Sequence, residues 1–447
     1  MSQSSLGLKA KHQLIDRFLG RKGSGGASGA GAIAGRALNR TAVPEAFTRF
    51  DRHPDYEKML VSKAAADRLG LRNPFFLRHE GLAGATTRIG GREYSNFASY
   101  NYLGLNGHPE VNRAAAAAVE HYGTSVSASR LVAGERPIQR ELEEALAEVY
   151  DAEDCVVFVS GHATNVSTLS TLFGPRDLIL HDSLIHNSIL EGARLSGATR
   201  RSFAHNDLAM LDAVLSELRG RFERVLIAVE GHYSMDGDVP DLPALVDIKR
   251  RHQCFLMVDE AHSLGVLGAS GKGLHEHFGV AGKDVDIWMG TLSKTLSGCG
   301  GYIAGERALV ELLKYAAPGF VYSVGISPPL AAASLAALRI MMREPERVES
   351  LRRNGQRFLE FATAAGLRTG SSQGYAIVPV ITGSSLKAAR LSNLMFEEGI
   401  NVQPVIHPAV EERAARLRFF LSAMHTPQVM EAACKAVKAL VDSGRAG

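Results

Sequence analysis

Cysteine is scarce in this chain, with 4 residues among 447, and no two of them stand close enough to form a CxxC pair. The sequence therefore predicts neither a structural zinc site nor a disulfide framework, and reduced thiols in a cytoplasm are the simplest interpretation. Asp236 and Asp238 share one short segment but lack the ligand spacing of a calcium loop. We therefore expect no metal centre.

Long apolar runs and an excess of one charge are also missing. No run reaches the roughly 18–20 apolar residues of a membrane span, and the first residues lack the pattern of a signal peptide. Lys and Arg number 50 and Asp and Glu 47, which gives a formal charge of +3. Nucleic-acid binders usually carry a basic stripe instead. We expect a cytoplasmic protein without a membrane span or a nucleic-acid partner.

Apolar runs of strand length alternate with helical stretches from about residue 90 onward. The predicted strands are 93–99, 154–159, 177–181, 224–230, 254–259 and 286–289, and a helix is predicted over 141–150. Short β-rich runs joined by helices favour a mostly parallel sheet covered by helices on both faces. Strand patterns at 375–381, 402–406 and 417–421, flanked by helices, predict a smaller C-terminal α+β domain.

The chain is predicted to have four parts. Glycine, alanine and serine dominate residues 20–35, which is typical of a flexible linker, and apolar spacing over 14–19 favours a short amphipathic helix before it. The parts are an N-terminal extension (1–45), an N-terminal segment (46–95), a large ligand-binding domain (96–340) and a small C-terminal domain (341–447).

Polar residues cluster just after the predicted strands, where ligands bind to parallel sheets. After strand 154–159, Ser160 and Gly161 open a helix whose N-terminal N–H groups could bind a phosphate. Strand 254–259 ends at Asp259 and is followed by His262. A carboxylate buried there needs a cation or hydrogen-bond donors, and a pyridinium N–H is a suitable partner.

Two further segments complete this set. Lys294 follows strand 286–289 among small and hydroxyl residues, and a desolvated lysine in such a setting can act as a Schiff-base nucleophile. His186 follows strand 177–181, and its imidazole could stack on a flat ring. A phosphate site, an acid, a stacking ring and a lysine together predict a site for pyridoxal 5′-phosphate (PLP).

Eight motifs in one order make the prediction more specific. They are SYNYLGL (99–105), GTSVSASRLVAGE (123–135), SGHATN (160–165), HNS (186–188), EGHYSMDGD (230–238), VDEAHSLGVLG (258–268), GTLSKTLSGCGGY (290–302) and RLRFFLSAMHT (416–426). Together they resemble the α-oxoamine synthases, which are fold-type I PLP enzymes and include serine palmitoyltransferase and 8-amino-7-oxononanoate synthase. The resemblance covers residues 97–425, nearly three quarters of the chain.

The resemblance implies roles around the cofactor ring. Lys294 would form the Schiff base and act as general base, while Asp259 would pair with the pyridinium nitrogen. His262 would hydrogen-bond the ring oxygen, Ser234 would lie near that oxygen, and His186 would stack on the ring. Lys294, His186, Asp259 and His262 are therefore the predicted catalytic residues.

The phosphate and the substrate are assigned in the same way. The residues implied to hold the phosphate are Ser160, Gly161, His162, Thr291 and Ser293. Arg418 would bind the substrate carboxylate, and Tyr100 and Asn101 are further substrate-binding candidates. His162 stands where relatives have an aromatic residue, so only a backbone contact is expected there. Gly325 and Ile326 stand where relatives have a hydroxyl that reaches the phosphate of a neighbouring subunit, so no residue is assigned to that role.

The resemblance also implies a reaction. An amino acid would condense with an acyl thioester, carried by CoA or an acyl carrier protein, to give an α-amino ketone, CO2 and the free thiol. The SYNYLGL stretch favours serine over glycine or alanine, and a homodimer is expected because sites of this fold lie between subunits in relatives. A PLP-dependent aminotransferase or an aldolase-like lyase is the alternative within PLP chemistry.

Two other classes of protein are possible interpretations: a nucleic-acid-dependent NTPase and a non-catalytic partner subunit. Residues 259–262 spell DEAH, the magnesium-binding box of some helicases, but neither Gly-Lys pair is followed by the hydroxyl residue of a phosphate-binding loop. A non-catalytic partner subunit would lack the Schiff-base lysine, whereas Lys294 is present. Both interpretations are weaker than that of a PLP enzyme.

Overall fold

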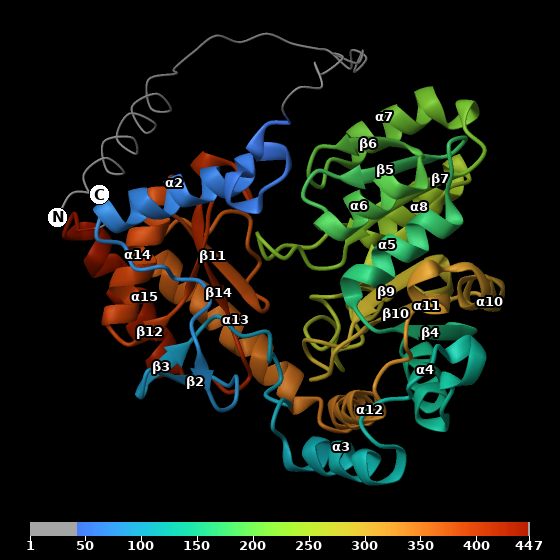
Figure 1. Ribbon diagram of the computed structural model, residues 1–447, viewed down its shortest axis with the longest axis horizontal. Coiled ribbons are helices and arrows are strands. Elements are labelled where there is room, and N and C mark those ends of the chain that lie inside the picture. The colour runs from blue at the N-terminus through green and yellow to red at the C-terminus, as the bar shows by residue number, and fades with distance from the viewer. Residues whose placement is uncertain (1–42, 446–447) are drawn as a thin grey trace. The chain divides into compact units, whose positions relative to one another are not determined.

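The computed structural model describes residues 43–445 (Figure 1). The predicted extension, with its linker and amphipathic helix, thus lies outside the described residues except for 43–45. The chain divides into two units at residue 73. In the first unit, α2 (Pro54–Arg68) begins with proline, and the His53 ring accepts a hydrogen bond from the Asp55 N–H. Two short 3-10 turns, Glu45–Phe47 and Phe50–Arg52, precede this helix.

A seven-stranded sheet forms the centre of the second unit, in the order β4-β10-β9-β8-β7-β5-β6. Its strands are β4 (Asp154–Phe158), β5 (Leu178–Asp182), β6 (Thr199–Phe203), β7 (Val225–Glu230), β8 (Phe255–Asp259), β9 (Ile287–Thr291) and β10 (Gly301–Gly305). All neighbours pair in parallel except β10, which is antiparallel to both β4 and β9. This confirms the predicted mostly parallel sheet.

Helices cover both faces of this sheet (Figure 1). Along β4, Cys155 and Val157 pack into one apolar cluster, whereas Val156 and Phe158 pack into another, because successive side chains of a strand point to opposite faces. The helices of this part are α3 (Pro109–Tyr122), α4 (Pro137–Val149), α5 (Gly161–Leu172), α6 (Asn187–Ser196), α7 (Leu208–Leu218), α8 (Leu242–His252), α9 (Leu274–Phe278), α10 (Arg307–Ala316), α11 (Pro318–Val321) and α12 (Pro328–Arg343).

Two strands of the large sheet were not predicted. β6 reads TRRSF, and four of its five side chains are exposed because it is the edge strand. An edge strand of this kind carries no apolar run for a sequence pattern to detect. β10 reads GYIAG, and its flanking glycines resemble loop sequence, although all five residues are buried.

Two small sheets complete the second unit. β11 (Ile377–Ile381), β14 (Arg416–Phe420) and β13 (Gln403–Val405) form an antiparallel sheet. The other sheet comprises β1 (His79–Glu80), β2 (Thr86–Ile89), β3 (Arg92–Asn96) and β12 (Ile400–Asn401). The nearby helices are α13 (Glu346–Ala364), α14 (Ser385–Glu397) and α15 (Pro427–Asp442). The strand predicted over 402–406 is confirmed as β13, which pairs with β14, whereas the short β12 just before it was not predicted and pairs with β3.

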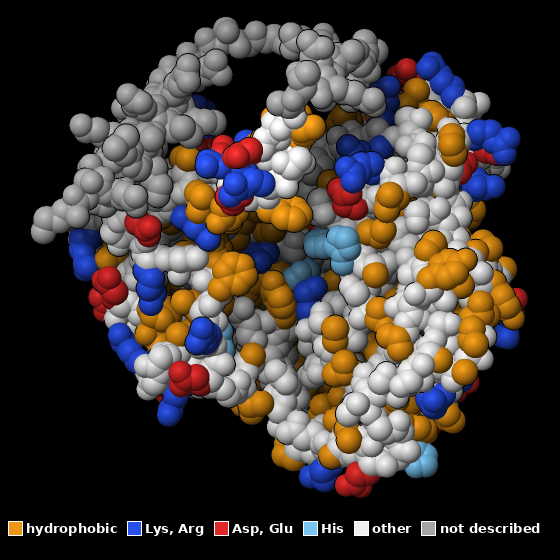
Figure 2. Space-filling view, viewed as in Figure 1, with side chains coloured by type: hydrophobic (Ala, Val, Ile, Leu, Met, Phe, Trp, Pro, Cys, Tyr) orange, Lys and Arg blue, Asp and Glu red, His pale blue; other side chains and the backbone are white. Residues whose placement is uncertain are grey.

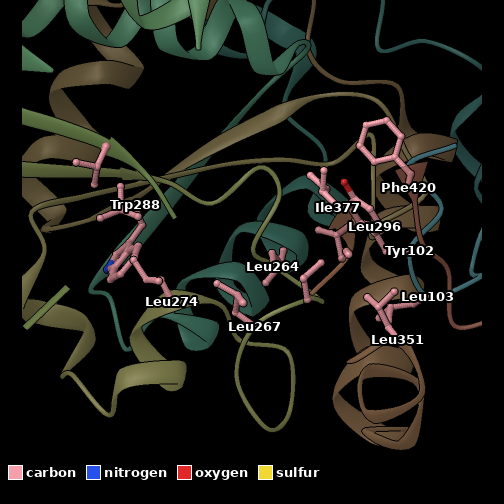
Figure 3. Close-up of a cluster of buried hydrophobic side chains, with 14 of the residues drawn as sticks. Tyr102, Leu103, Leu264, Leu267, Leu274, Trp288, Leu296, Leu351, Ile377 and Phe420 are labelled. Carbon is pink, nitrogen blue, oxygen red and sulfur yellow. The ribbon is translucent and has the colours of Figure 1, made fainter. Parts of the chain in front are cut away.

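One apolar cluster joins the large sheet to the small C-terminal sheet. Figure 3 shows it extending from Trp288 on β9, past Leu264 and Leu296, to Ile377 and Phe420. All five side chains are almost completely buried. This packing holds residues of β14 close to the ends of the central strands. Among the described residues, no helix is both long and apolar enough to cross a bilayer.

Candidate active site

A cavity of about 230 Å³ opens where the central strands end. Nine of the thirteen predicted site residues line it: Ser160, Gly161, His162, His186, Asp259, His262, Thr291, Ser293 and Lys294. It is also lined by Asn165, Ser188, Glu230, Ala261, Met289, Cys299 and Gly300. Figure 2 shows histidine side chains beside side chains in the shared colour of Lys and Arg, gathered in a hollow near the middle of one face.

Helix α5 presents its N-terminus to this cavity. The Ser160 hydroxyl accepts a hydrogen bond from the Ala163 N–H at 3.4 Å, so Ser160 caps the helix. Glycine is required beside it, because a Cβ on Gly301 would lie 2.6 Å from the Cα of Gly161. The Thr291 hydroxyl is 2.8 Å from that of Ser293. Free backbone N–H groups and two hydroxyls together suit an anion such as a phosphate.

The carboxylate of Asp259 is fixed by two donors. The Asn165 side-chain amide donates to Oδ2 at 3.0 Å, and the Ala261 N–H donates to Oδ1 at 3.0 Å. The same Asn165 amide also donates to the Ser188 hydroxyl at 2.9 Å. These contacts orient a nearly fully buried negative charge towards a cationic partner in the cavity.

His186 caps α6 with its ring. Its Nδ1 accepts a hydrogen bond from the Ser188 N–H at 3.3 Å and lies 2.7 Å from the Ser188 hydroxyl. Burial lowers the pKa of His186, although the charge of Asp259 opposes this effect. The imidazole is therefore neutral at pH 7 and, since Nδ1 accepts, carries its proton on Nε2.

His262 is held from two sides. Its Nδ1 lies 2.7 Å from the Tyr102 hydroxyl, and its carbonyl oxygen is 3.1 Å from Nδ1 of His232. Burial, together with the positive charges of Lys294 and Arg418, lowers the pKa of His262 well below 6.5. The ring therefore meets the cavity as a neutral imidazole.

Burial lowers the pKa of Lys294 to about 8, against the attraction of the Asp259 carboxylate. Its Nζ lies 5.5 Å from the centroid of the Tyr100 ring. Lys294 also lines a second cavity of about 490 Å³, together with Tyr100 and Asn101. The Asn101 amide donates to the carbonyl of Ala83, and its oxygen accepts the N–H of Asn106, so this side chain also fixes the loop.

Ser234 and Arg418 do not line the first cavity. Arg418 Nη1 donates to the carbonyl of Ser234 at 2.9 Å, and its guanidinium lies 4.6 Å from the centroid of the Phe420 ring. The Ser234 N–H in turn donates to Glu230 at 3.0 Å. The charge of Arg418 nevertheless influences the site, since it contributes to the lowered pKa of Lys294.

These residues fit PLP. The helix N-terminus suits its phosphate, the fixed carboxylate of Asp259 suits its pyridinium nitrogen, and Lys294 is an amine that burial keeps partly unprotonated near neutral pH. The neutral rings of His186 and His262 add no charge that would compete with the pairing at Asp259.

Comparison with known proteins is consistent with this site. The sequence profile described as "Aminotransferase class I and II" matches residues 92–437. The chain belongs to this family. It is 42% identical over 348 residues to an 8-amino-7-oxononanoate synthase from Symbiobacterium thermophilum, which covers 78% of this chain and 88% of the relative.

The fold of this chain is also similar to that of solved structures. A serine palmitoyltransferase from S. paucimobilis with bound PLP matches with a TM-score of 0.83 and 27% identity, over 87% of this chain and 98% of that one. An 8-amino-7-oxononanoate synthase from Francisella tularensis matches with a TM-score of 0.68 and 27% identity, over 78% and 98%. The chain is an α-oxoamine synthase that depends on PLP, as the sequence resemblance implied.

Sequence reasoning missed several residues of this site. Asn165 and Ser188 lie within quoted motifs, but only the fold brings their side chains to Asp259 and His186. The sequence also gives no sign of the contacts of His205, whose ring bridges Asp182 at 3.0 Å and Asp238 at 2.9 Å. Although burial opposes it, these two carboxylates raise the pKa of His205 to about 10. An imidazolium thus ties β5 to the turn after β7.

Proposed function

We propose that this chain joins a small α-amino acid to an acyl thioester, with loss of CO2, and that Lys294 is the proton-transferring base. The observation that carries the proposal is the position of Lys294 in one cavity with Asp259, His186 and His262. An amine with a pKa of about 8 is a competent base near neutral pH, because a much larger fraction of it is unprotonated than of an ordinary lysine.

Each residue has a proposed task in this reaction. Bound PLP supplies an electron sink for the bonds of the amino acid's α-carbon. Lys294 Nζ would take the proton from that carbon, while Asp259 would hold a proton on the cofactor's ring nitrogen. His186 would cover one face of the ring, and Arg418 would bind the amino acid's carboxylate. The α-carbon would attack the carbonyl carbon of the thioester, so that a carbon–carbon bond forms while the carbon–sulfur bond breaks and the thiol leaves. The carboxylate would then leave the α-carbon as CO2, and a proton would return to that carbon.

Serine is the amino acid that we propose. The second cavity beside Lys294 is lined by Ser99, Asn101 and Asn106, whose polar groups suit a substrate hydroxyl. The likeness to a serine palmitoyltransferase structure supports the same choice. The higher identity to an 8-amino-7-oxononanoate synthase keeps alanine as the second candidate.

The test is a titration of the PLP-loaded enzyme with serine, alanine and glycine, followed by visible absorbance. Acyl-CoA and an acyl carrier protein thioester are then supplied in turn, while CO2 and free thiol are measured. Serine should change the absorbance at the lowest concentration and release CO2 only when thioester is present. Tighter binding of alanine would overturn the choice of serine. Transfer of the amino group to an oxo acid without CO2 would indicate an aminotransferase.

Arg418→Lys checks the proposed carboxylate contact. The variant keeps the charge but loses the planar pair of donors, so KM for the amino acid should rise about tenfold or more while PLP affinity changes little. Arg416→Lys is a suitable control, because Arg416 lies on the same strand as Arg418 but binds Asp236 and the carbonyl of Met235. An unchanged KM for Arg418→Lys would contradict the assignment.

We also propose that the protein is a homodimer. The Gly325 N–H donates to the carbonyl of Ala128 at 3.1 Å and joins two segments that expose apolar side chains. Val132 is 82% and Tyr322 87% exposed. Sedimentation velocity should show a dimer that Val132→Glu with Tyr322→Glu dissociates, whereas Tyr315→Glu, at another exposed tyrosine, leaves it intact. A monomeric wild-type protein would contradict this proposal.

A further inference from the structure

Three acidic side chains lie at neighbouring ends of the central sheet. β7 lies between β5 and β8, and these strands end at Glu230, Asp182 and Asp259 respectively. Glu230 and Asp259 are paired in register. All three residues are nearly fully buried. Three adjacent carboxylates cannot all remain charged in such surroundings without compensation, because each like charge disfavours the next.

The two outer carboxylates are compensated and the central one is not. Asp182 binds the imidazolium of His205 and accepts the N–H groups of Leu184 and Asn206. Asp259 accepts two hydrogen bonds, as described above. Glu230 accepts only the Ser234 N–H, at Oε2. Its Oε1 has no hydrogen-bond partner among the described residues, although Glu230 lines the cavity.

We propose that Glu230 is a neutral, protonated carboxyl that donates a hydrogen bond from Oε1 to an oxygen of the ligand in this cavity. A protonated carboxyl has one donor, whereas a carboxylate has none. The positive charges of Lys294 and Arg418 favour the ionised form of Glu230, whereas the negative charges of Asp259 and Asp182 disfavour it. The acceptor oxygen belongs either to PLP or to the amino acid that binds with it.

The pKa of Glu230 agrees with this geometry. Burial first, and the charge of Asp259 second, raise the pKa of Glu230 to about 8. The carboxyl is therefore mostly protonated at pH 7. Asp259 is the only carboxylic acid among the predicted site residues, so the hydrogen-bonding role of Glu230 adds a second one to the site.

Two substitutions at Glu230 separate a neutral donor from a charged group. Glu230→Gln keeps a donor of nearly the same shape without a charge, whereas Glu230→Leu removes the donor. In PLP titrations of the apoenzyme without substrates, Glu230→Gln should bind within about twofold of wild type and Glu230→Leu about tenfold more weakly. If PLP affinity is unchanged in Glu230→Leu, serine and alanine affinity of the PLP-loaded protein should show the tenfold loss instead, which identifies the acceptor as a substrate oxygen.

Infrared spectroscopy gives a readout that does not depend on activity. The wild-type minus Glu230→Gln difference spectrum at pH 7 should contain the C=O stretch of a protonated carboxyl, and this band should disappear as pH rises through about 8. Glu260 is also buried with a pKa raised to about 8, but it accepts the Leu274 N–H and does not line the cavity. Glu260→Gln should therefore remove a different band without weakening PLP binding.

Three results would overturn the proposal. Equal loss of ligand affinity in Glu230→Gln and Glu230→Leu would indicate that a charge is required. The other two are an unchanged affinity of both variants for PLP and for the amino acid, and the absence of the infrared band of the protonated carboxyl. Because PLP uptake is measured without substrates, these results are distinct from a failure of the acyl-transfer reaction proposed above.

Discussion

The Tyr102 hydroxyl lies 2.7 Å from Nδ1 of His262, and both side chains are buried. Burial raises the pKa of Tyr102 well above 10, so the phenol keeps its proton. If Nδ1 carried a proton, the phenol proton would have no acceptor among the described residues. The phenol therefore donates to Nδ1, and the imidazole proton is on Nε2.

Tyr102→Phe removes this donor. The proton of His262 should then distribute between the two ring nitrogens, and kcat/KM should fall about tenfold, as expected for one buried hydrogen bond. Nitrogen NMR of labelled histidine reports the tautomer directly. Tyr150→Phe is a matched control, because the Tyr150 hydroxyl bonds that of Tyr302 within the core. The same tautomer in Tyr102→Phe and wild type would refute the assignment.

Asn165→Ala should weaken PLP binding, because it removes the amide that fixes Asp259 and Ser188. A loss of about tenfold in PLP affinity is expected from one hydrogen bond to a charged group. Asn354→Ala removes a comparable buried amide, which bonds the carbonyls of Ser422 and His425. That control should lose stability without losing PLP affinity. If fluorescence titration shows equal losses in the two variants, Asn165 has no special role at the site.

Lys294 should destabilise the PLP-free fold in a pH-dependent way. Its amine titrates at about 8 in the folded chain and near 10.5 in the unfolded chain. Between these pH values the unfolded chain binds more protons, so the free energy of unfolding rises with pH. Relative to Lys294→Met, the free energy of unfolding of wild type should increase by roughly 1–3 kcal/mol between pH 8 and pH 10.5. Urea unfolding at both pH values measures this gain, and a difference independent of pH would contradict the lowered pKa.

His205 should have the opposite dependence. Its ring titrates near 6.5 when unfolded and at about 10 when folded, so its stabilisation is complete below pH 6.5 and is lost as pH rises to about 10. The free energy of unfolding of His205→Gln should be roughly 1–3 kcal/mol below that of wild type at pH 6 and nearly equal to it at pH 10. His252→Gln is the control, because His252 pairs with the partly exposed Asp212. Its loss should stay below about 1 kcal/mol. Equal loss from His205→Gln at both pH values would rule out an imidazolium bridge.

Much of the fold could be predicted from local sequence. The strands ending at Glu230 and Asp259 are apolar runs, and a run buried on both faces is readable without any partner. The edge strand β6 could not be predicted, because four of its five side chains are exposed and its sequence therefore has no apolar pattern. The strand β12 could not be predicted for another reason: it has only two residues, and it pairs with β3 while the nearby β13 pairs with β14 of a different sheet.

The sequence by itself determined the type of chemistry, since the order of a helix-opening Ser160, an Asp259 after a strand and a Lys294 among small residues indicated PLP. It could not show that Glu230 lacks a partner, that Asn165 reaches Asp259, or that Tyr102 orients His262. These relationships join side chains 94 and 160 positions apart in the chain, or depend on strand order. Only tertiary packing decides them, because burial and hydrogen-bond geometry are properties of the assembled sheet and not of any local segment.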